Sequence, residues 1–446
     1  MTINMNDMVI ISVDDHITEP PDLFDKHLSP EHLATAPKFC TDENGKNYWT
    51  YQGMYMPSVG LNAVVGRPPE EYGMEPSSLE QMRKGVYDVH ARIDDMNANG
   101  IAASLNFGTV AGFDGGRFHK AENKELALIH LRAYNDWHID EWCGAYPGRF
   151  IPCGILPTWD MDATIAEIKR IAAKGCTAVA LNENPTVNGL PSIHDEYWEP
   201  MWKAITDYDI TMCLHIGGGN PSPHASMETP IEAWITTMPM SVAVGAADWL
   251  NLSALQRYPT MKIALSESGI GWIPYFMERA DFSHARHKAW TNSAANFQGK
   301  KPSDVFRKHF MSCFIDDDFG LKNLSAFDED MVAYECDYPH SDTLWPEVPE
   351  YLHKSVQCLT DEQVAKVTHK NAMRFFNFDP FKHYKREELT VGALRAAAAA
   401  ANVDTTPKSY GGAKPLADGE EGRRVVSGDL MKMFAHHAEA QTRSAK

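Results

Sequence analysis

The sequence predicts an α/β protein built around a (β/α)8 TIM barrel of the metal-dependent hydrolase type. The first observation is that short apolar runs alternate with longer amphipathic segments, a pattern typical of a parallel sheet with helical connections. The second is that the chain contains eight such units, which predicts closure of the sheet. The third is that several apolar runs end on His or Asp, and in these barrels the chemistry lies at the carboxyl ends of the strands.

The strands and helices can be assigned in chain order. We predict strands at residues 9–13, 101–107, 150–156, 177–181, 211–215, 262–266, 311–315 and 331–336. Amphipathic stretches predict helices at 86–99, 122–144, 161–174, 197–207, 230–252, 273–288 and 361–376. Gly100 follows the first of these helices and is suited to end it.

Two segments interrupt this rhythm. Residues 23–84 follow the first strand and contain the alternating aromatic stretch 47–55, which predicts a hairpin in an insertion near the pocket mouth. We assign residues 1–380 to the barrel with its insertion. Residues 381–446 are too poor in apolar residues to form their own core, yet they hold apolar anchors at 425–426 and 430–434. We expect this extension to pack on the barrel or on a partner subunit of a homodimer or larger assembly.

Composition excludes several classes of function. The chain has 446 residues, of which 43% are hydrophobic, and its net charge of −19 argues against a nucleic-acid surface. No run approaches the roughly 20 apolar residues of a membrane helix, and the polar N-terminus does not resemble a signal peptide. The eight cysteines lack CxxC spacing, which favours reduced thiols in the cytoplasm. No Walker motif is present, and 217–219 lacks dinucleotide-loop spacing. We therefore expect a cytoplasmic protein with a small-molecule substrate.

Four residues at strand ends are candidate metal ligands. Asp14 and His16 are two apart, so in an extended strand they point the same way, although they could instead cap the next segment. His215 ends a strand before three glycines; alone it would equally be a core histidine. Asp337 ends the last strand, where a buried carboxylate requires an ion or a salt bridge. Together these residues predict one divalent ion, Zn²⁺ before Mn²⁺.

Other polar residues at strand ends are candidates for catalysis. Glu267 follows the sixth strand and could be an extra ligand, a proton carrier or a hydrogen-bonding support. His340 could be a base, a support for a ligand, or a loop residue packed on Trp345. Within 316–318, one aspartate could orient a ligand histidine while the others cap the next helix. Three further residues could shape a pocket for a cyclic substrate: Phe107, Trp159 and Asn182.

The motifs around these residues resemble those of the amidohydrolase superfamily. They are Ser12–His16 with Glu19-Pro20-Pro21-Asp22-Leu23-Phe24, Leu214–Gly219, Glu267–Trp272, Cys336–Asp342 and Asn371–Phe376. The chain is similar to the amidohydrolase-2 branch, which includes aminocarboxymuconate-semialdehyde decarboxylase and γ-resorcylate decarboxylase, from about residue 9 to 378. This resemblance implies a (β/α)8 barrel with one divalent metal held by Asp14, His16, His215 and Asp337.

One position departs from the branch. Its decarboxylases usually place a histidine that serves in proton transfer at the end of strand six, where this chain has Glu267. The first strand carries Asp-x-His, close to the acidic-x-His pair of some decarboxylases. We expect a metal-dependent decarboxylase of a small cyclic or aromatic carboxylate, with Glu267, Asp337 or His340 as the acid. The alternatives are metal-dependent hydrolysis, with Asp337 accepting a proton from water, and a non-catalytic ligand-binding barrel.

Overall fold

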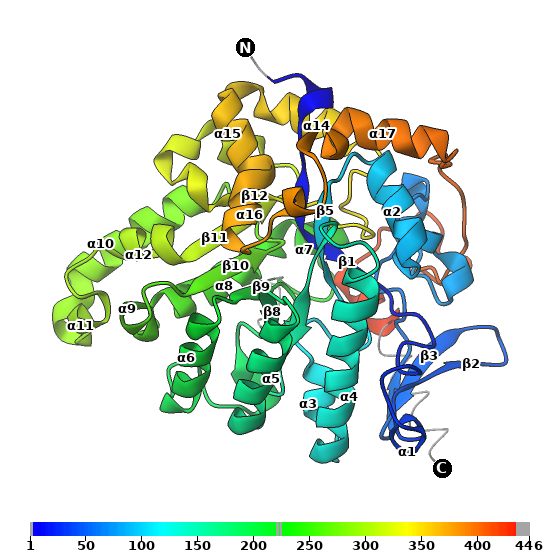
Figure 1. Ribbon diagram of the computed structural model, residues 1–446, viewed down its shortest axis with the longest axis horizontal. Coiled ribbons are helices and arrows are strands. Elements are labelled where there is room, and N and C mark those ends of the chain that lie inside the picture. The colour runs from blue at the N-terminus through cyan, green and yellow to red at the C-terminus, as the bar shows by residue number, and fades with distance from the viewer. Residues whose placement is uncertain (1–2, 220–222, 224, 434–446) are drawn as a thin grey trace.

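A parallel sheet forms the centre of the molecule, for which the computed structural model describes residues 3–219, 223 and 225–433 (Figure 1). Its strands are β1 (Ile11–His16), β5 (Ala103–Phe107), β6 (Phe150–Ile151), β7 (Cys153–Ile155), β8 (Ala178–Leu181), β9 (Thr211–His215), β10 (Lys262–Ser266), β11 (Phe310–Phe314) and β12 (Val332–Tyr334). Small apolar side chains such as Ala103, Ala178 and Ala264 fill its interior.

The sheet closes on itself at Pro152. The strand order is β6-β5-β1-β12-β11-β10-β9-β8-β7, and the hydrogen-bonded neighbours are parallel. β6 and β7 stand at opposite ends of this order but are separated in the chain by Pro152 alone. Because proline cannot donate a ladder hydrogen bond, it divides one strand into two short pieces. The two pieces join the ends of the sheet, so the predicted eight-stranded barrel is confirmed.

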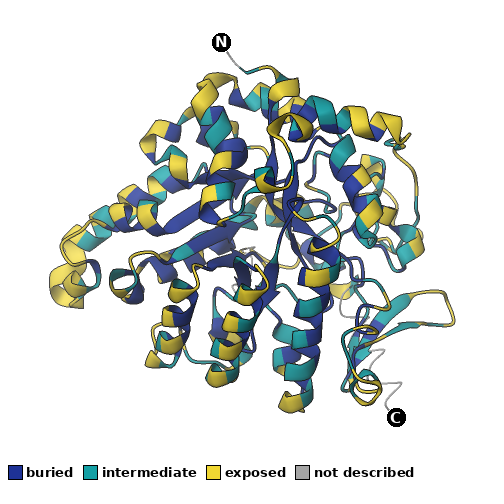
Figure 2. Cartoon of the chain, in the orientation of Figure 1, coloured by how far each residue is buried: buried dark blue, intermediate teal, exposed yellow. Residues whose placement is uncertain are grey.

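Helices surround this barrel with their buried faces toward it (Figure 2). They are α1 (Pro30–Leu33), α2 (Val89–Ala98), α3 (Gly116–Lys120), α4 (Lys124–Asp136), α5 (Met161–Ala173), α6 (Glu199–Asp207), α7 (Ile231–Thr237), α8 (Pro239–Leu250), α9 (Ala254–Arg257), α10 (Ile273–Thr291), α11 (Ala294–Phe297), α12 (Pro302–His309), α13 (Asp318–Lys322), α14 (Val348–Ser355), α15 (Asp361–Ala365), α16 (Asn371–Phe375) and α17 (Val391–Ala400). Two π-helical turns, η5 (Trp137–Cys143) and η11 (Lys366–Lys370), extend α4 and join α15 to α16. None of the helices among the described residues has the length and apolar character needed to span a bilayer.

The first strand differs from its predicted bounds. It was expected at residues 9–13, whereas β1 runs from Ile11 to His16. Its register with β5 shifts between Ser12 and Asp15. The apolar run marks only the part of the strand that lies in the core, while the polar end continues the ladder through Asp14. Asp14 and His16 are therefore strand residues, held by the barrel rather than by a loop.

The insertion forms a small antiparallel sheet beside the barrel. It comprises β2 (Lys38–Thr41), β3 (Asn47–Tyr51) and β4 (Met54–Met56), in that order. The predicted hairpin is β3 and β4, and its turn has positive φ at Gln52 and Gly53, as two-residue hairpin turns require. β2 was not predicted, because the run 38–41 is too short and polar to stand out.

The described part of the C-terminal extension lies along the barrel. α17 packs against α2, and the N–H of Val391 donates to the carbonyl of Met8 at 2.9 Å. Farther on, single β-bridges join Ala413 to Glu75 and Val426 to Pro230. Of the predicted apolar anchors, Phe434 lies outside the described residues. The extension thus contacts the N-terminus, the insertion and the segment before α7.

Candidate metal centre

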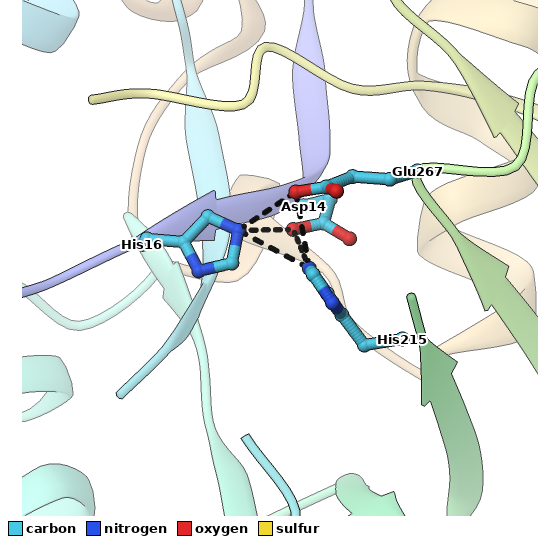
Figure 3. Close-up of side chains that lie close together, drawn as sticks. All are labelled: Asp14, His16, His215 and Glu267. Atoms are coloured by element: carbon cyan, nitrogen blue, oxygen red, sulfur yellow. Dashed lines mark hydrogen bonds and ion pairs between the residues drawn. The ribbon is translucent and has the colours of Figure 1, made fainter. Parts of the chain in front are cut away.

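Four acidic and imidazole side chains converge at the carboxyl ends of three strands (Figure 3). Asp14 and His16 come from β1, His215 ends β9, and Glu267 directly follows β10. Asp15, between the two β1 residues, faces elsewhere and accepts a 2.8 Å hydrogen bond from Ser12. The pleat of β1 therefore brings alternate residues to one site, as side-chain alternation requires.

Short distances connect the four side chains. His16 Nε2 lies 3.3 Å from Asp14 Oδ1, 3.1 Å from Glu267 Oε1 and 3.2 Å from His215 Nε2. His215 Nε2 lies 3.2 Å from Glu267 Oε1 and 3.6 Å from Asp14 Oδ1. His215 Nδ1 donates to the carbonyl of Ile216 at 2.6 Å, which directs its Nε2 into the cluster.

The surroundings of the Asp14 carboxylate are those expected of a metal ligand. The residue is fully buried, and neither carboxylate oxygen has hydrogen-bond geometry to any described residue. A carboxylate in this state is costly to bury unless a cation lies beside it. Two imidazole nitrogens and carboxylate oxygens are suitable donors for Zn²⁺ or Mn²⁺. The residues present therefore fit one divalent ion between Asp14, His16, His215 and Glu267.

Asp337 contacts the cluster through His16 and His340. Its Oδ1 is 3.4 Å from His16 Nε2 and 2.8 Å from His340 Nδ1. His340 stacks on His16, with ring centroids 3.9 Å apart, and its Nδ1 is 3.6 Å from Glu267 Oε1. Asp337, His340, His16 and Glu267 thus form a second set of possible ligands that overlaps the first. Among the described residues, the ring contact of His340 is with His16, and the indole of Trp345 lies against the guanidinium of Arg83.

Burial and neighbouring charges raise the pKa of some side chains in the cluster and lower the pKa of others. Burial raises the pKa of Asp337 well above its ordinary value, and the charges of Glu267 and Asp14 raise it further. Burial also opposes ionisation of Glu267, but His215 and His16 outweigh it and hold that pKa well below its usual range. Burial disfavours protonated His215, yet Glu267 and Asp14 raise its pKa well above 6.5. A bound cation would replace such protons, because ligands bind metal in their deprotonated forms.

Aromatic rings form one wall of the site. Phe107 lies 4.9 Å from the ring of His215, and Phe113 lies 4.3 Å from it. Phe113 was not predicted, because it lies in a Gly-rich loop after β5 with no periodic signal. Asn182 lies at the adjoining loop, where its Nδ2 donates to the carbonyl of Gly218 at 2.6 Å. Phe107 and Asn182 are thus placed near His215.

Trp159 occupies a different position. Its ring lies 5.8 Å from that of His119 and 5.4 Å from the ammonium of Lys124. Among the described residues, the recorded ring contacts of Trp159 do not include the metal cluster. A role in substrate binding therefore has no support from its contacts.

The aspartates at 316–318 support the fold around the site. Asp317 accepts hydrogen bonds from the N–H groups of Ile270 and Gly271 at 2.8 and 2.7 Å, and it caps α13 through Gly320. Asp318 pairs with Lys322 on the surface. In the described part of the chain, no recorded hydrogen bond joins these aspartates to a ligand histidine, so the capping alternative matches the contacts.

Besides Phe113, a second residue of the site was missed from the sequence. Glu335 is buried and accepts the N–H of Glu267 at 3.0 Å, and the thiol of Cys313 lies 2.5 Å from its Oε2. The available signal was alternation, because Glu335 is two residues before Asp337 and shares its face of the strand end. A glutamate within an apolar run was itself a reason to look for a partner.

A cavity of about 440 Å³ opens beside Glu267. Its lining combines the carboxylates of Glu267, Glu335 and Asp342 with apolar groups such as Phe314 and Met238. Burial raises the pKa of Asp342, and the charge of Glu267 adds to this effect. The cavity is therefore acidic on the side of the cluster and apolar elsewhere, and it is large enough for a small ring compound.

Comparison with known proteins agrees with this architecture. A relative from Dictyostelium discoideum, 2-amino-3-carboxymuconate-6-semialdehyde decarboxylase, is 23% identical over 310 residues, covering 68% of this chain and 81% of that protein. The structure of an amidohydrolase from Mycobacterium avium subsp. paratuberculosis K-10 matches with a TM-score of 0.63 at 17% identity, covering 82% of this chain and 99% of that one.

A second solved structure is that of 5-carboxyvanillate decarboxylase from Novosphingobium aromaticivorans, complexed with manganese and 4-hydroxy-3-methoxy-5-nitrobenzoic acid. It matches with a TM-score of 0.56 at 17% identity and covers 84% of this chain and 98% of that one. At this identity the likeness shows the barrel fold.

The family assignment rests on a longer match. The sequence profile of the amidohydrolase family matches residues 64–378, well over half of the chain. The matched part contains His215, Glu267, Asp337 and His340, whereas Asp14 and His16 lie before it. From its sequence match and its barrel, this chain belongs to the amidohydrolase family.

Proposed function

We propose that this chain is a divalent-metal-dependent carboxy-lyase acting on a small cyclic or aromatic carboxylate. The observation that carries the proposal is the buried cluster of Asp14, His16, His215 and Glu267 at the strand ends, with Asp337 and His340 beside it. Relatives named as decarboxylases, from Dictyostelium discoideum and Novosphingobium aromaticivorans, support the choice of reaction.

In this proposal Asp14, His16 and His215 hold the ion and Glu267 is the fourth ligand. Glu267 is preferred to Asp337 because its Oε1 lies within 3.2 Å of both imidazole Nε2 atoms, whereas the short contacts of Asp337 are with His16 and His340. The donor set accommodates Zn²⁺ and Mn²⁺. When bound, the ion supplies a fixed positive charge that attracts substrate oxygens and withdraws electron density from them.

Asp337 and His340 are proposed as the proton carriers. Decarboxylation requires a proton at the ring carbon that loses CO₂, and a positioned acid supplies it. Asp337 Oδ1 and His340 Nδ1 are 2.8 Å apart without hydrogen-bond alignment, so the His340 ring would have to turn for a proton to pass between them. The side chain of His340 is 12% exposed and that of Asp337 is 4% exposed, so His340 is the more accessible of the two.

The pocket favours one orientation of the substrate. The carboxylates of Glu267, Glu335 and Asp342 repel a free substrate carboxylate, so a substrate carboxylate or an adjacent oxygen is expected to face the ion. The rings of Phe107 and Phe113 meet edge to face beside His215 and offer apolar surface to a ring system. Asn182 lines a separate cavity with Asp114 and Trp249, and its amide binds Asp114, Gly218 and Asn184.

Release of CO₂ is the test. The protein loaded with Zn²⁺ or Mn²⁺ is incubated with hydroxylated benzoates and with carboxymuconate-type compounds, and CO₂ and ring product are quantified. Metal-dependent CO₂ release that the Asp337→Asn variant loses is the expected result.

Hydrolysis is the second candidate, since the Asp337–His340 pair could also accept a proton from water. Turnover of lactones or esters without CO₂ would favour hydrolysis, and no turnover of either class would favour a ligand-binding barrel.

We also propose that the protein forms a homodimer through α10. One side of this helix exposes Tyr275, Phe282 and Trp290 by 72%, 53% and 76%, at spacings that place them on one face. Glu278 and Arg286 lie four residues before and after Phe282. In a two-fold antiparallel pairing centred on Phe282, Glu278 would therefore face Arg286 of the partner subunit.

Light scattering tests this interface. Phe282→Glu should shift the protein from dimer to monomer, because it places two like charges at the two-fold axis. Tyr208→Glu on another exposed site is the matched control. A wild-type monomer, or a dimer in both variants, would contradict the proposal. We further propose the cytoplasm as the compartment, because all eight cysteines are unpaired and six of them are buried, three of these within strands.

A further inference from the structure

A second group of metal-binding side chains lies directly beside Asp14. Asp14, Cys313 and Glu335 each offer one ligand atom, and these atoms lie within 4.8 Å of one another. Cys313 is in β11 and Glu335 directly follows β12, so the group sits inside the barrel next to the first cluster. All three side chains are buried, with residue exposures of 0%, 2% and 1%.

The contacts of Asp14 with the histidines use one of its two carboxylate oxygens. Its Oδ1 makes the contacts with His16 and His215, and in Figure 3 the dashed contacts of Asp14 converge on one of its oxygens. Neither Oδ1 nor Oδ2 has a hydrogen-bond partner among the described residues. A fully buried carboxylate with two unpartnered oxygens is suited to bind a cation on each side. We propose that Asp14 bridges two divalent cations and that Cys313 and Glu335 hold the second. This inference rests on the metal centre proposed above.

The charge balance of the region supports a second cation. Four buried or nearly buried carboxylates stand close together here, namely Asp14, Glu267, Glu335 and Asp337. Within the part of the chain that the structure describes, their ion pairs are with histidines, and none is with a lysine or arginine. Burial raises the pKa of both Asp337 and Glu335 well above their ordinary values, so without an ion these two carboxyls favour their neutral forms. A second divalent ion would take the place of the Glu335 proton, because ligands bind metal in their deprotonated forms.

The thiol of Cys313 restricts the kind of ion. Sulfur ligands favour zinc and softer ions, whereas magnesium and calcium prefer oxygen ligands alone. The second site is therefore assigned to Zn²⁺, for which Cd²⁺ is a spectroscopic probe. The competing account is that Cys313 donates its proton to Glu335 Oε2, which also accepts the Glu267 N–H. That account needs no second ion and predicts a single one.

Metal titration distinguishes the two accounts. The full-length protein carrying Cys40→Ser and Cys358→Ser, which removes the two thiols that are not buried, is titrated with Cd²⁺. Bound metal is counted by elemental analysis after dialysis, and thiolate-to-cadmium charge-transfer absorption is followed in the ultraviolet. We expect this protein to bind two equivalents of Cd²⁺ and to show the charge-transfer band. In this background Cys313→Ser and Glu335→Gln should each bind one equivalent, and Cys313→Ser should lose the band. Cys213→Ser, another buried thiol of the barrel interior, should retain both.

Each outcome has a defined meaning. One equivalent without the band would overturn the second site and leave the first intact, whereas no bound metal would overturn the proposed metal centre as well. Two equivalents that persist in both Cys313→Ser and Glu335→Gln would place the second ion elsewhere and overturn the assignment. If a variant does not fold, the equivalents and the band of the parent protein still decide between one ion and two.

Discussion

The backbone N–H of Glu267 donates a 3.0 Å hydrogen bond to Oε2 of Glu335. Glu267 has φ of 51° and Asp337 has φ of 53°, in the left-handed region that residues other than glycine rarely adopt. The hydrogen bond joins the end of β10 to the end of β12 and so restrains the backbone at Glu267. Strained acidic residues beyond strand ends, here on either side of β11, are typical of functional sites, where the surrounding structure holds the strain.

The first prediction concerns Glu267. The Glu267→Gln variant should keep its fold, because the backbone N–H that binds Glu335 is retained. It removes the negative charge that faces His16 and His215 and that serves as the proposed fourth ligand, so metal affinity and with it turnover should fall by at least about 10–100-fold. Rates are measured on the substrate identified by CO₂ release, with circular dichroism as the folding control. An unchanged kcat would assign Glu267 a purely structural role. The variant Glu267→His would show whether the site accepts the decarboxylase-like arrangement.

The second prediction concerns metal content. His215→Ala removes an imidazole whose Nε2 lies within 3.6 Å of three other candidate ligand atoms. We expect affinity for the ion to fall by at least the 10–100-fold that loss of an outer-shell partner costs. Elemental analysis of protein purified without added metal measures the effect. His309→Ala is the control, since that buried histidine contacts the carbonyl of Met261 outside the cluster. Equal metal content in the wild type and His215→Ala would refute the ligand assignment.

The barrel was predictable because its signal is repeated eight times. Apolar runs mark the buried part of every strand, and alternation with helices fixes a parallel sheet. The polar ends of strands carry no such signal, so β1 was predicted to end before Asp14 although it continues to His16. The short strand β2 was missed for the same reason, because residues 38–41 are only partly buried.

The candidate site was predictable only in part. Strand-end position selected Asp14, His16, His215, Glu267 and Asp337, which the structure brings together. It did not select Phe113, whose loop has no hydrophobic periodicity, or Glu335, which lies inside an apolar run. Trp159 was selected by the same rule but faces His119, because the chain after a strand can turn outward. Which of Glu267 and Asp337 binds the ion depends on distances that no sequence pattern contains.

The third prediction concerns the C-terminal extension. Truncation before Lys385 removes α17, whose Val391 bonds to Met8 and whose Arg395 pairs with Glu350. It also removes the bridge between Ala413 and Glu75. The melting temperature should fall, because α2 and the N-terminus lose a buried apolar contact. Light scattering should still show a dimer if α10 forms the interface. An unchanged melting temperature would show that the extension is dispensable.

The last prediction concerns acid stability and His138, in the π-helical turn η5. Its ring is buried, and neither nitrogen has a hydrogen-bond partner among the described residues. Burial lowers the pKa of His138 from 6.5 to about 4, so the folded protein holds this ring neutral. Below pH 6.5 the unfolded chain takes up a proton that the folded protein does not. Stability is therefore lost as pH falls from 6.5 to about 4, by about 3 kcal/mol over the interval. His138→Phe should remove this loss, so that its free energy of unfolding changes less than that of the wild type between pH 7 and pH 4.5 in urea titrations. The exposed His383→Phe is the control. Equal pH dependence in wild type and His138→Phe would show that the ring is not held neutral.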